Sequence, residues 1–220
     1  MPREEPSVST ADVARRLRRA GLELPQAQNE TLARFLALLM QWNRVYNLTG
    51  IRDLEELVER HLVESLALRP LLRGERIADV GTGAGLPGVP LAITEPKRSF
   101  TLIESRAKRV RFLRHALAEL GLRNAVVAHG RAEHLRPERP FDTVLARAVA
   151  PPAELLEICR SLTAPGSILL LLTAAHLQAE FDGLAPDFVS RTVEPERGAR
   201  APKLRSSIVL LERTDVQTQR

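Results

Sequence analysis

The chain of 220 residues is 44% hydrophobic and 27% charged, a composition typical of a globular protein with a sizeable core. A single cysteine excludes an internal disulfide framework and a cysteine-rich metal site, and no apolar stretch is long enough for a membrane span or a signal peptide, so we expect a cytoplasmic protein without a metal. The net charge of +5 is compatible with a nucleic-acid partner but too small to establish one.

The first 72 residues are predicted to be helical. Apolar residues recur there at i, i+3, i+4 and i+7, the spacing of one helix face. Ser9 is a suitable N-terminal cap for the first helix, and Gly21 is a stop signal at its end. We expect residues 1–72 to form a helical cap on a domain of residues 73–220. The predicted helices are 9–20, 25–44 and 53–68.

From residue 76 onward, short apolar runs alternate with helical segments. Strands separated by helices form a parallel sheet covered on both faces, so the sequence predicts a doubly wound α/β domain. The last two strands lack an intervening helix and should form a closing antiparallel pair in a mostly parallel, seven-stranded sheet. The predicted strands are 77–80, 100–104, 125–128, 143–146, 167–172, 188–193 and 207–211. The predicted helices are 86–94, 106–120 and 153–162.

A glycine-rich turn follows the first predicted strand. Glycines allow a sharp turn and the close approach of a ligand, and Pro87 suits the first turn of the helix that follows. The stretch from Gly83 to Gly88 formally matches a dinucleotide fingerprint, which would make the chain a nicotinamide oxidoreductase. However, the glycine that directly follows the strand is Gly81, preceded by Asp79. An acid there would repel a pyrophosphate and could orient an ammonium group, which favours S-adenosyl-L-methionine as the cofactor.

Two further segments fit a nucleoside. Glu104 ends the second predicted strand, where a carboxylate can accept hydrogen bonds from both ribose hydroxyls. The segment 130–133 follows the third strand, where the edge of an adenine would lie. Together with the glycine turn, these positions predict a nucleoside cofactor at the carboxyl ends of the strands.

These segments together resemble the RsmG (GidB) family, over residues 30–213. The resemblance implies a Rossmann-like class I methyltransferase fold and methyl transfer from S-adenosyl-L-methionine to N7 of a guanine in the decoding-region loop of bacterial 16S rRNA. The expected partner is then 16S rRNA or the small ribosomal subunit, and we expect a monomer. The segments that carry the resemblance are 42–49, 61–66, 79–90, 108–114, 130–133 and 146–150.

The family also implies roles for single positions. Gly81 and Leu86 correspond to cofactor contacts in the first loop, and Ala132 and Glu133 to the pair beside the adenine. Arg147 corresponds to a cofactor-proximal residue at the mouth of the site, and we expect it to be catalytic. General methyltransferase logic and the charge argument add the remaining expected cofactor contacts, which are Asp79, Gly83, Gly85 and Glu104.

The sequence departs from the family pattern at three places. Residues 173–176 stand where a Lys-Gly pair is usual, which concerns contacts to the substrate more than cofactor binding. Glu64 stands where aspartate is more usual. Arg205-Ser206-Ser207 stands where the family more often has Arg-His. Two alternatives stay open. One is a methyltransferase for small molecules, whose cap would enclose a pocket, and the other is a non-catalytic RNA-binding assembly factor, which the missing Lys-Gly pair makes worth testing.

The acceptor atom can be argued partly from residues that are missing. Amino-group methyltransferases place a polar residue and an aromatic residue around two prolines after strand four, whereas residues 150–153 are Ala-Pro-Pro-Ala. Cys159 lies on the apolar stripe of its helix, which favours a core position over a nucleophile. Guanine N7 has an exposed lone pair and needs no base, so catalysis would be mainly positioning, with Arg147 on a phosphate or on the guanine O6 edge.

Basic and aromatic residues give weaker signals for RNA binding. Trp42 and Tyr46 could stack on an extruded base, although we favour core positions for both. His61, with Asn47 and Thr49, is expected to pin the cap to the sheet. Five cations on the predicted helix 106–120 could contact phosphates or form a solvated face. They are Arg106, Lys108, Arg109, Arg111 and Arg114.

Overall fold

A seven-stranded sheet forms the centre of the computed structural model, which describes residues 8–147, 151–173, 181, 184, 186–194, 204 and 206–215. The strand order is β3-β2-β1-β4-β5-β7-β6; β1 to β5 pair in parallel, and β7 is antiparallel to both β5 and β6. The predicted sheet and its closing antiparallel pair are confirmed. The strands are β1 (Arg76–Val80), β2 (Ser99–Glu104), β3 (Ala125–His129), β4 (Thr143–Arg147), β5 (Ile168–Thr173), β6 (Phe188–Val193) and β7 (Ser207–Arg213).

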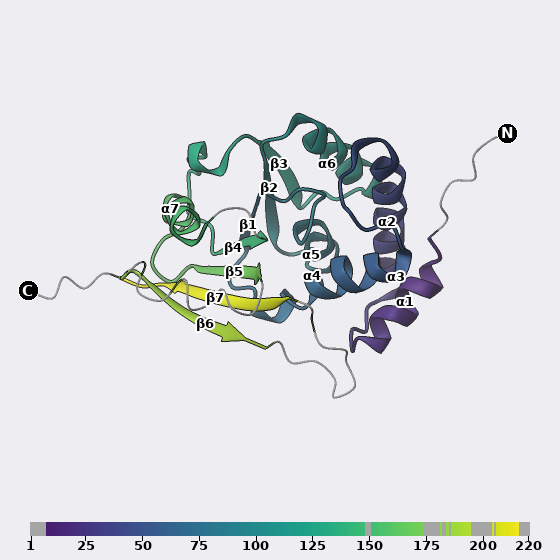
Figure 1. Ribbon diagram of the computed structural model, residues 1–220, viewed down its shortest axis with the longest axis horizontal. Coiled ribbons are helices and arrows are strands. Elements are labelled where there is room, and N and C mark those ends of the chain that lie inside the picture. The colour runs from purple at the N-terminus through teal and green to yellow at the C-terminus, as the bar shows by residue number, and fades with distance from the viewer. Residues whose placement is uncertain are drawn as a thin grey trace, which may run out of the picture.

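Helices cover both faces of the sheet (Figure 1). On one face lie α5 (Gly88–Thr94) and α6 (Ala107–Leu120), and on the other lies α7 (Pro152–Leu162). Successive strand residues point to opposite faces, so Ile77 belongs to the core beneath α5 and α6, whereas Ala78 belongs to the core beneath α7. The apolar side chains of the central strands are therefore buried on both faces, whereas Val126 on β3 and Val189 on β6, the two edge strands, are exposed.

The N-terminal helices pack on α5 and α6. In this layer α2 contacts α5 and α6, and α4 contacts α5 (Figure 1). Ser9 caps the first helix, its hydroxyl accepting a hydrogen bond from the amide of Asp12 at 3.4 Å, as the sequence predicted. The elements are α1 (Thr10–Arg19), α2 (Gln26–Tyr46), α3 (Leu54–Leu57), the π-helical segment η1 (Val58–Val63), α4 (Glu64–Leu66) and the 3₁₀ turn η2 (Arg69–Leu71).

Two local predictions were wrong. The predicted helix 53–68 is interrupted by the π-helical turn η1, in which the amide of Glu64 donates to the carbonyl of Glu59, five residues back. Apolar periodicity did not reveal it, because apolar spacing does not specify which backbone amide bonds to which carbonyl. Pro87 precedes α5 and does not lie in its first turn, since the helix begins at Gly88 and Pro87 occupies the cap position.

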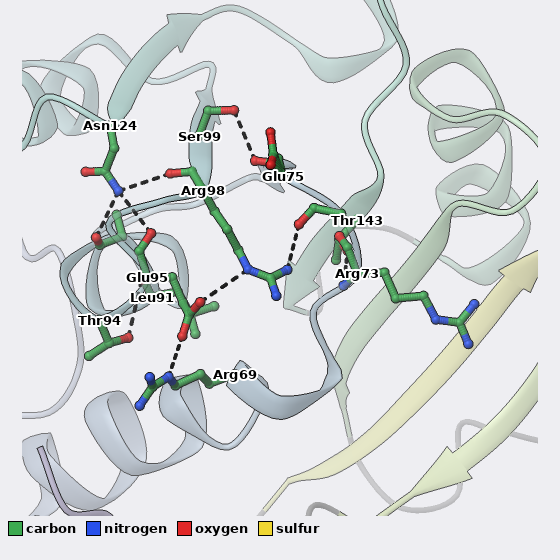
Figure 2. A network of polar contacts seen from close by, with 12 residues as sticks. Arg69, Arg73, Glu75, Leu91, Thr94, Glu95, Arg98, Ser99, Asn124 and Thr143 are labelled. Carbon is green, nitrogen blue, oxygen red and sulfur yellow. Dashed lines mark hydrogen bonds and ion pairs between the residues drawn. The ribbon is translucent and has the colours of Figure 1, made fainter.

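The amino ends of the strands are closed by a polar network (Figure 2). The side-chain amide of Asn124 lies within 3.3 Å of the carbonyl oxygens of Ala92, Glu95 and Arg98 and donates to all three. The Glu95 carboxylate pairs with Arg69 and Arg98. These bonds tie the loops before β2 and β3 to the end of α5, so this end of the sheet is structural. None of the described helices is long and apolar enough to cross a membrane.

Candidate functional site

A cavity of about 370 Å³ lies at the carboxyl ends of the parallel strands. The strand order reverses between β1 and β4, and ligands of doubly wound sheets bind at such a switch point. The volume falls in the range of small-molecule sites, about 300–1,000 Å³. Five of the predicted site residues line this cavity, namely Gly81, Glu104, Ala132, Glu133 and Arg147.

The remaining predicted residues support the cavity from behind. Asp79, Gly83, Gly85 and Leu86 belong to the same turn but are not among the residues that line the cavity. Gly81, Gly83 and Gly85 adopt φ values of 63°, 62° and 85°, in the left-handed region that favours glycine. A Cβ at Gly85 would meet Cγ2 of Val89 at 2.7 Å. The glycine spacing therefore reflects both backbone conformation and close packing against α5.

Asp79 braces this turn from inside. It is 1% exposed, and its Oδ2 accepts hydrogen bonds from the Thr82 hydroxyl at 2.6 Å and from the amide of Gly88 at 2.9 Å. Its Oδ1 is buried and has no hydrogen-bond partner among the described residues. Burial raises the pKa of Asp79 to about 7, although both hydrogen bonds and the charge of Arg147 act in the opposite direction. The expected contact between Asp79 and an ammonium group stays a prediction.

Glu104 is placed where a ribose would need an acceptor. It ends β2 and is 3% exposed. Its Oε2 accepts from the amide of Gly83 at 3.0 Å, and its Oε1 accepts from the amide of Arg106 at 2.8 Å. Nη1 of Arg109 lies 3.5 Å from Oε2. A carboxylate oxygen has two acceptor positions, so Oε1 keeps one for a ligand hydroxyl beside its backbone partner, whereas Oε2 also has the Arg109 guanidinium nearby. A buried carboxylate that can accept from a hydroxyl fits the ribose of the expected nucleoside cofactor.

Arg147 reaches the cavity from the end of β4. Its Nη2 lies 3.4 Å from Oε2 of Glu64 and 3.3 Å from the carbonyl oxygen of Arg60. Burial lowers the pKa of Arg147, while the charges of Glu64 and Asp79 raise it. An arginine starts so far above neutrality that the guanidinium stays charged. The site therefore holds a fixed positive charge opposite the acidic tip of β2.

Several residues that line the cavity were missed by the sequence analysis. Arg106 and Arg109 had been considered only as phosphate contacts, yet both line the cavity. Glu154, in the first turn of α7, carries no sequence signal of its own. The other missed residues are Val80, Ile103, Ser105 and Ile158. Gly130 and Arg131 also line the cavity, and they belong to the segment 130–133 that was expected to lie near the adenine.

Trp42 and Tyr46, for which core positions were expected, are only partly buried and pack against the edge of the core. The ring of Trp42 stacks on Tyr46 at 5.2 Å between centroids, and it lies 5.6 Å from Phe112 and 5.3 Å from His115. Cys159 is fully buried, and burial raises its pKa to about 12, which agrees with the expected core position.

His61 binds within the cap. Its Nε2 lies 2.9 Å from the hydroxyl of Thr49, so this bond joins two cap segments and does not join cap to sheet as predicted. Asn47 ends α2 in the left-handed region, with φ of 47°. Among the described residues, no group of three or more His, Cys, Asp or Glu side chains could hold a metal ion. The predicted segments 148–150 and 174–176, and also Arg205, lie outside the described residues.

Comparisons with known proteins point to one family. The model of the family described as GidB, rRNA small subunit methyltransferase G, matches residues 28–202. A ribosomal RNA small subunit methyltransferase G from Vibrio vulnificus (strain CMCP6) is 38% identical over 200 residues, covering 88% of this chain and 92% of the relative. One of the same description from Halorhodospira halophila is 45% identical over 194 residues, with the same two coverages.

Solved structures share the fold at low sequence identity. A methyltransferase from Geobacter sulfurreducens has a TM-score of 0.57 at 18% identity and covers 82% of this chain and 88% of its own. A variant of MtNAS in complex with S-adenosylmethionine has a TM-score of 0.56 at 16% identity and covers 96% of this chain and 86% of its own. The seven-stranded sheet is therefore that of Rossmann-like methyltransferases.

Proposed function

We propose which reaction this chain catalyses, starting from the finding that it belongs to the rRNA small subunit methyltransferase G (GidB) family. The proposed reaction is the transfer of a methyl group to N7 of a guanine in the decoding-region loop of 16S rRNA. The chain is an S-adenosylmethionine-dependent rRNA methyltransferase. Family membership decides against the nicotinamide oxidoreductase and the small-molecule methyltransferase as alternatives. The guanine N7 acceptor and the residue roles below are our proposals.

The proposed cofactor site rests mainly on one observation, the hydrogen bonding of the buried Glu104 carboxylate at the cavity. Each oxygen has one backbone donor, and Oε2 also has Arg109 Nη1 at 3.5 Å, so the carboxylate would accept from the ribose hydroxyls beside these partners. Gly81 would admit the amino-acid end of the cofactor without a Cβ in the way, and Ala132 and Glu133 would flank the adenine. Asp79, Gly83, Gly85 and Leu86 would act by holding the shape of this turn.

Arg147 would position the acceptor base. S-adenosylmethionine, when bound, supplies an electrophilic methyl group on a sulfonium. The N7 lone pair carries no proton, so no residue has to remove one. The fixed charge of Arg147 at the cavity can hold the guanine O6 edge or a neighbouring phosphate and so align N7 for attack.

The RNA would enter over α6. Arg106 and Arg109 line the cavity, and the exposed side chains of Lys108, Arg111 and Arg114 continue the positive charge along the same helix. Such a surface binds phosphates without reading sequence. We propose that residues 73–220 form the catalytic domain and residues 1–72 a cap on it, because the N-terminal helices contact α5 and α6.

We also propose that the chain acts as a monomer in the cytoplasm, where bacterial ribosomes are assembled. The large hydrophobic side chains that the described residues expose are scattered over separate segments, which is usual for a monomer. They are Val45, Val126, Leu184 and Val189.

Methyl transfer to small ribosomal subunits tests the proposed function. The purified chain, radiolabelled S-adenosylmethionine and subunits from a strain that lacks this gene should yield labelled 7-methylguanosine in a nucleoside digest. Arg147→Ala should lower kcat by about 100-fold, a typical cost of lost positioning, with little change in S-adenosylhomocysteine affinity by calorimetry. Glu104→Gln should instead weaken that affinity.

The control substrate is 16S rRNA without ribosomal proteins. Transfer to subunits but not to this RNA would show that the enzyme requires the assembled subunit, whereas transfer to both would show that the RNA is sufficient. A labelled product other than 7-methylguanosine would overturn the acceptor assignment. Normal transfer by Arg147→Ala would overturn the role of Arg147.

A further inference from the structure

A buried carboxylate from the cap contacts Arg147 and has no part in the function described so far. Glu64 is 3% exposed and lies in the first turn after η1. Its Oε2 is 3.4 Å from Nη2 of Arg147, which is 83 residues away in sequence. Glu64 does not line the cavity, whereas Arg147 does. An effect of Glu64 on the reaction would therefore pass through Arg147.

The π-helical turn supplies the second contact to the same nitrogen. In an α-helix the amide of Glu64 would donate to the carbonyl of Arg60, four residues back. In η1 it donates to the carbonyl of Glu59, and the carbonyl of Arg60 accepts from Nη2 of Arg147 at 3.3 Å. The widened turn thus offers a carbonyl and a carboxylate to one guanidinium nitrogen. Such single π turns occur often at functional sites.

Stability alone explains this contact poorly. A buried ion pair must offset the desolvation of both charges, and it does so only with good geometry and further hydrogen bonds. Here the contact is single, and Oε1 of Glu64 and Nε of Arg147 are buried without hydrogen-bond partners among the described residues. A partly satisfied pair of this kind costs stability, so an orienting role explains it better.

We propose that Glu64 is a positioning residue for methyl transfer, which with the Arg60 carbonyl holds the Arg147 guanidinium at the cavity so that its remaining donors meet the RNA. The proposal rests on the proposed role of Arg147. Through the contacts of Glu64 and the Arg60 carbonyl with Arg147, the helical cap contributes to the geometry of the active site in addition to covering the sheet. The exposed Glu59 shares the turn with Glu64 but has no such contact among the described residues.

A double-mutant cycle tests the proposal on the full chain. Glu64→Gln keeps the shape of the side chain and removes its charge, so it should lower kcat by about 10- to 100-fold, as a misplaced positioning group does. KM for small subunits and the affinity for S-adenosylhomocysteine should change by no more than about threefold, because neither ligand loses a direct contact. Glu64→Gln combined with Arg147→Ala should be no slower than Arg147→Ala alone.

Two comparisons separate positioning from structure. Glu64→Asp retains the charge and should give a kcat between those of Glu64→Gln and the unmodified chain. Glu59→Gln removes a carboxylate from the same turn at an exposed position and should leave kcat unchanged. If Glu64→Gln fails to fold, the cycle is run with Glu64→Asp, whose loss of kcat should vanish in the Arg147→Ala background.

Wild-type kcat in Glu64→Gln, or losses that multiply in the double variant, would overturn the proposal and leave the proposed function standing. A loss of cofactor affinity and melting temperature that accounts for the lost rate would also overturn it, since Glu64 would then be structural. Normal transfer by Arg147→Ala would overturn both this proposal and the assigned role of Arg147.

Discussion

At the scale of single residues, the start of α5 leaves no room for a side chain at position 88. A Cβ built on Gly88 would lie 2.4 Å from Cδ2 of Leu102 and 2.7 Å from Oδ2 of Asp79. Leu102 is buried in the core, and Oδ2 of Asp79 is held by two hydrogen bonds, one of them from the amide of Gly88 itself. Neither neighbour can move without loosening the glycine turn.

Gly88→Ala should therefore lower the free energy of unfolding by about 1–3 kcal/mol, the usual cost of overpacking a core. Urea denaturation at neutral pH measures the change. Gly50→Ala is the matched control, because nothing lies within 4 Å of a Cβ at Gly50, and it should leave stability nearly unchanged. Equal stability of the two variants would show that the side chains of Asp79 and Leu102 can shift to admit a Cβ at position 88 at little cost in free energy.

The sequence predicts the backbone turn at the glycines better than it predicts the direction of the Asp79 carboxylate. The spacing of Gly81, Gly83 and Gly85 predicts a turn, and all three adopt positive φ. The direction of the Asp79 carboxylate could not be predicted, because it depends on Thr82 and Gly88 folding back onto it. The charge argument correctly put Asp79 near the end of β1, but it did not predict the hydrogen bonds that Asp79 accepts from Thr82 and Gly88.

At the scale of elements, the third predicted helix shows the limit of a periodic pattern. Leu57, Val58, Leu62 and Leu66 are all buried, as the stripe predicted. The π turn between them changes which backbone amide meets which carbonyl, and apolar spacing carries no information on that pairing. The sequence therefore predicted a buried helical face but not the contact between the Arg60 carbonyl and Arg147.

The basic face of α6 provides a test of RNA binding. Lys108 and Arg114 are exposed and carry no ion pair among the described residues, whereas Arg109 is near Glu104 and Arg111 lies over the ring of Tyr46. Lys108→Gln with Arg114→Gln should raise KM for small subunits by about 10-fold or more and reduce the salt slope by about 0.7–0.9 per lost contact. Because both side chains lie outside the cavity lining, kcat should change little.

Arg18→Gln with Arg19→Gln on α1 is the matched control, since it removes two exposed positive charges from another helix. Steady-state transfer at several salt concentrations compares the two double variants. Equal KM values would mean that the charges on α6 are only a solvated helix face. The same result would leave the cofactor site unaffected, because S-adenosylhomocysteine binding is measured separately.

At the scale of the whole molecule, sequence periodicity was sufficient for the sheet but not for the contact between cap and sheet. Alternating strands and helices allow few topologies, and the seven predicted strands agree with the observed ones within two residues at each end. The contact of Glu64 and Arg60 with Arg147 joins segments more than 80 residues apart. Such a contact depends on how the layers pack, which no local pattern encodes.

Two buried groups give the stability of the molecule an opposed dependence on pH. Burial and the charge of Arg147 lower the pKa of His61 from 6.5 to about 4, and burial raises that of Asp79 from 3.8 to about 7. Between pH 4 and 6.5 the unfolded chain binds more protons at His61, so this group makes stability rise with pH. Over pH 4–7 the folded chain binds more protons at Asp79, so this group makes stability fall with pH.

Removing one group should isolate the contribution of that group. Relative to the unmodified chain, Asp79→Asn should become progressively more stable as pH rises from about 4 to 7, and His61→Gln progressively less stable from about 4 to 6.5. Each change should be on the order of 3 kcal/mol, because one pKa unit is worth about 1.4 kcal/mol. Urea denaturation from pH 4.5 to 7.5 gives both difference curves, in which the other titrating groups cancel. A flat curve would mean that the group removed has the same pKa in the folded and unfolded chain, and a curve of the opposite sign would mean that its pKa is shifted in the opposite direction.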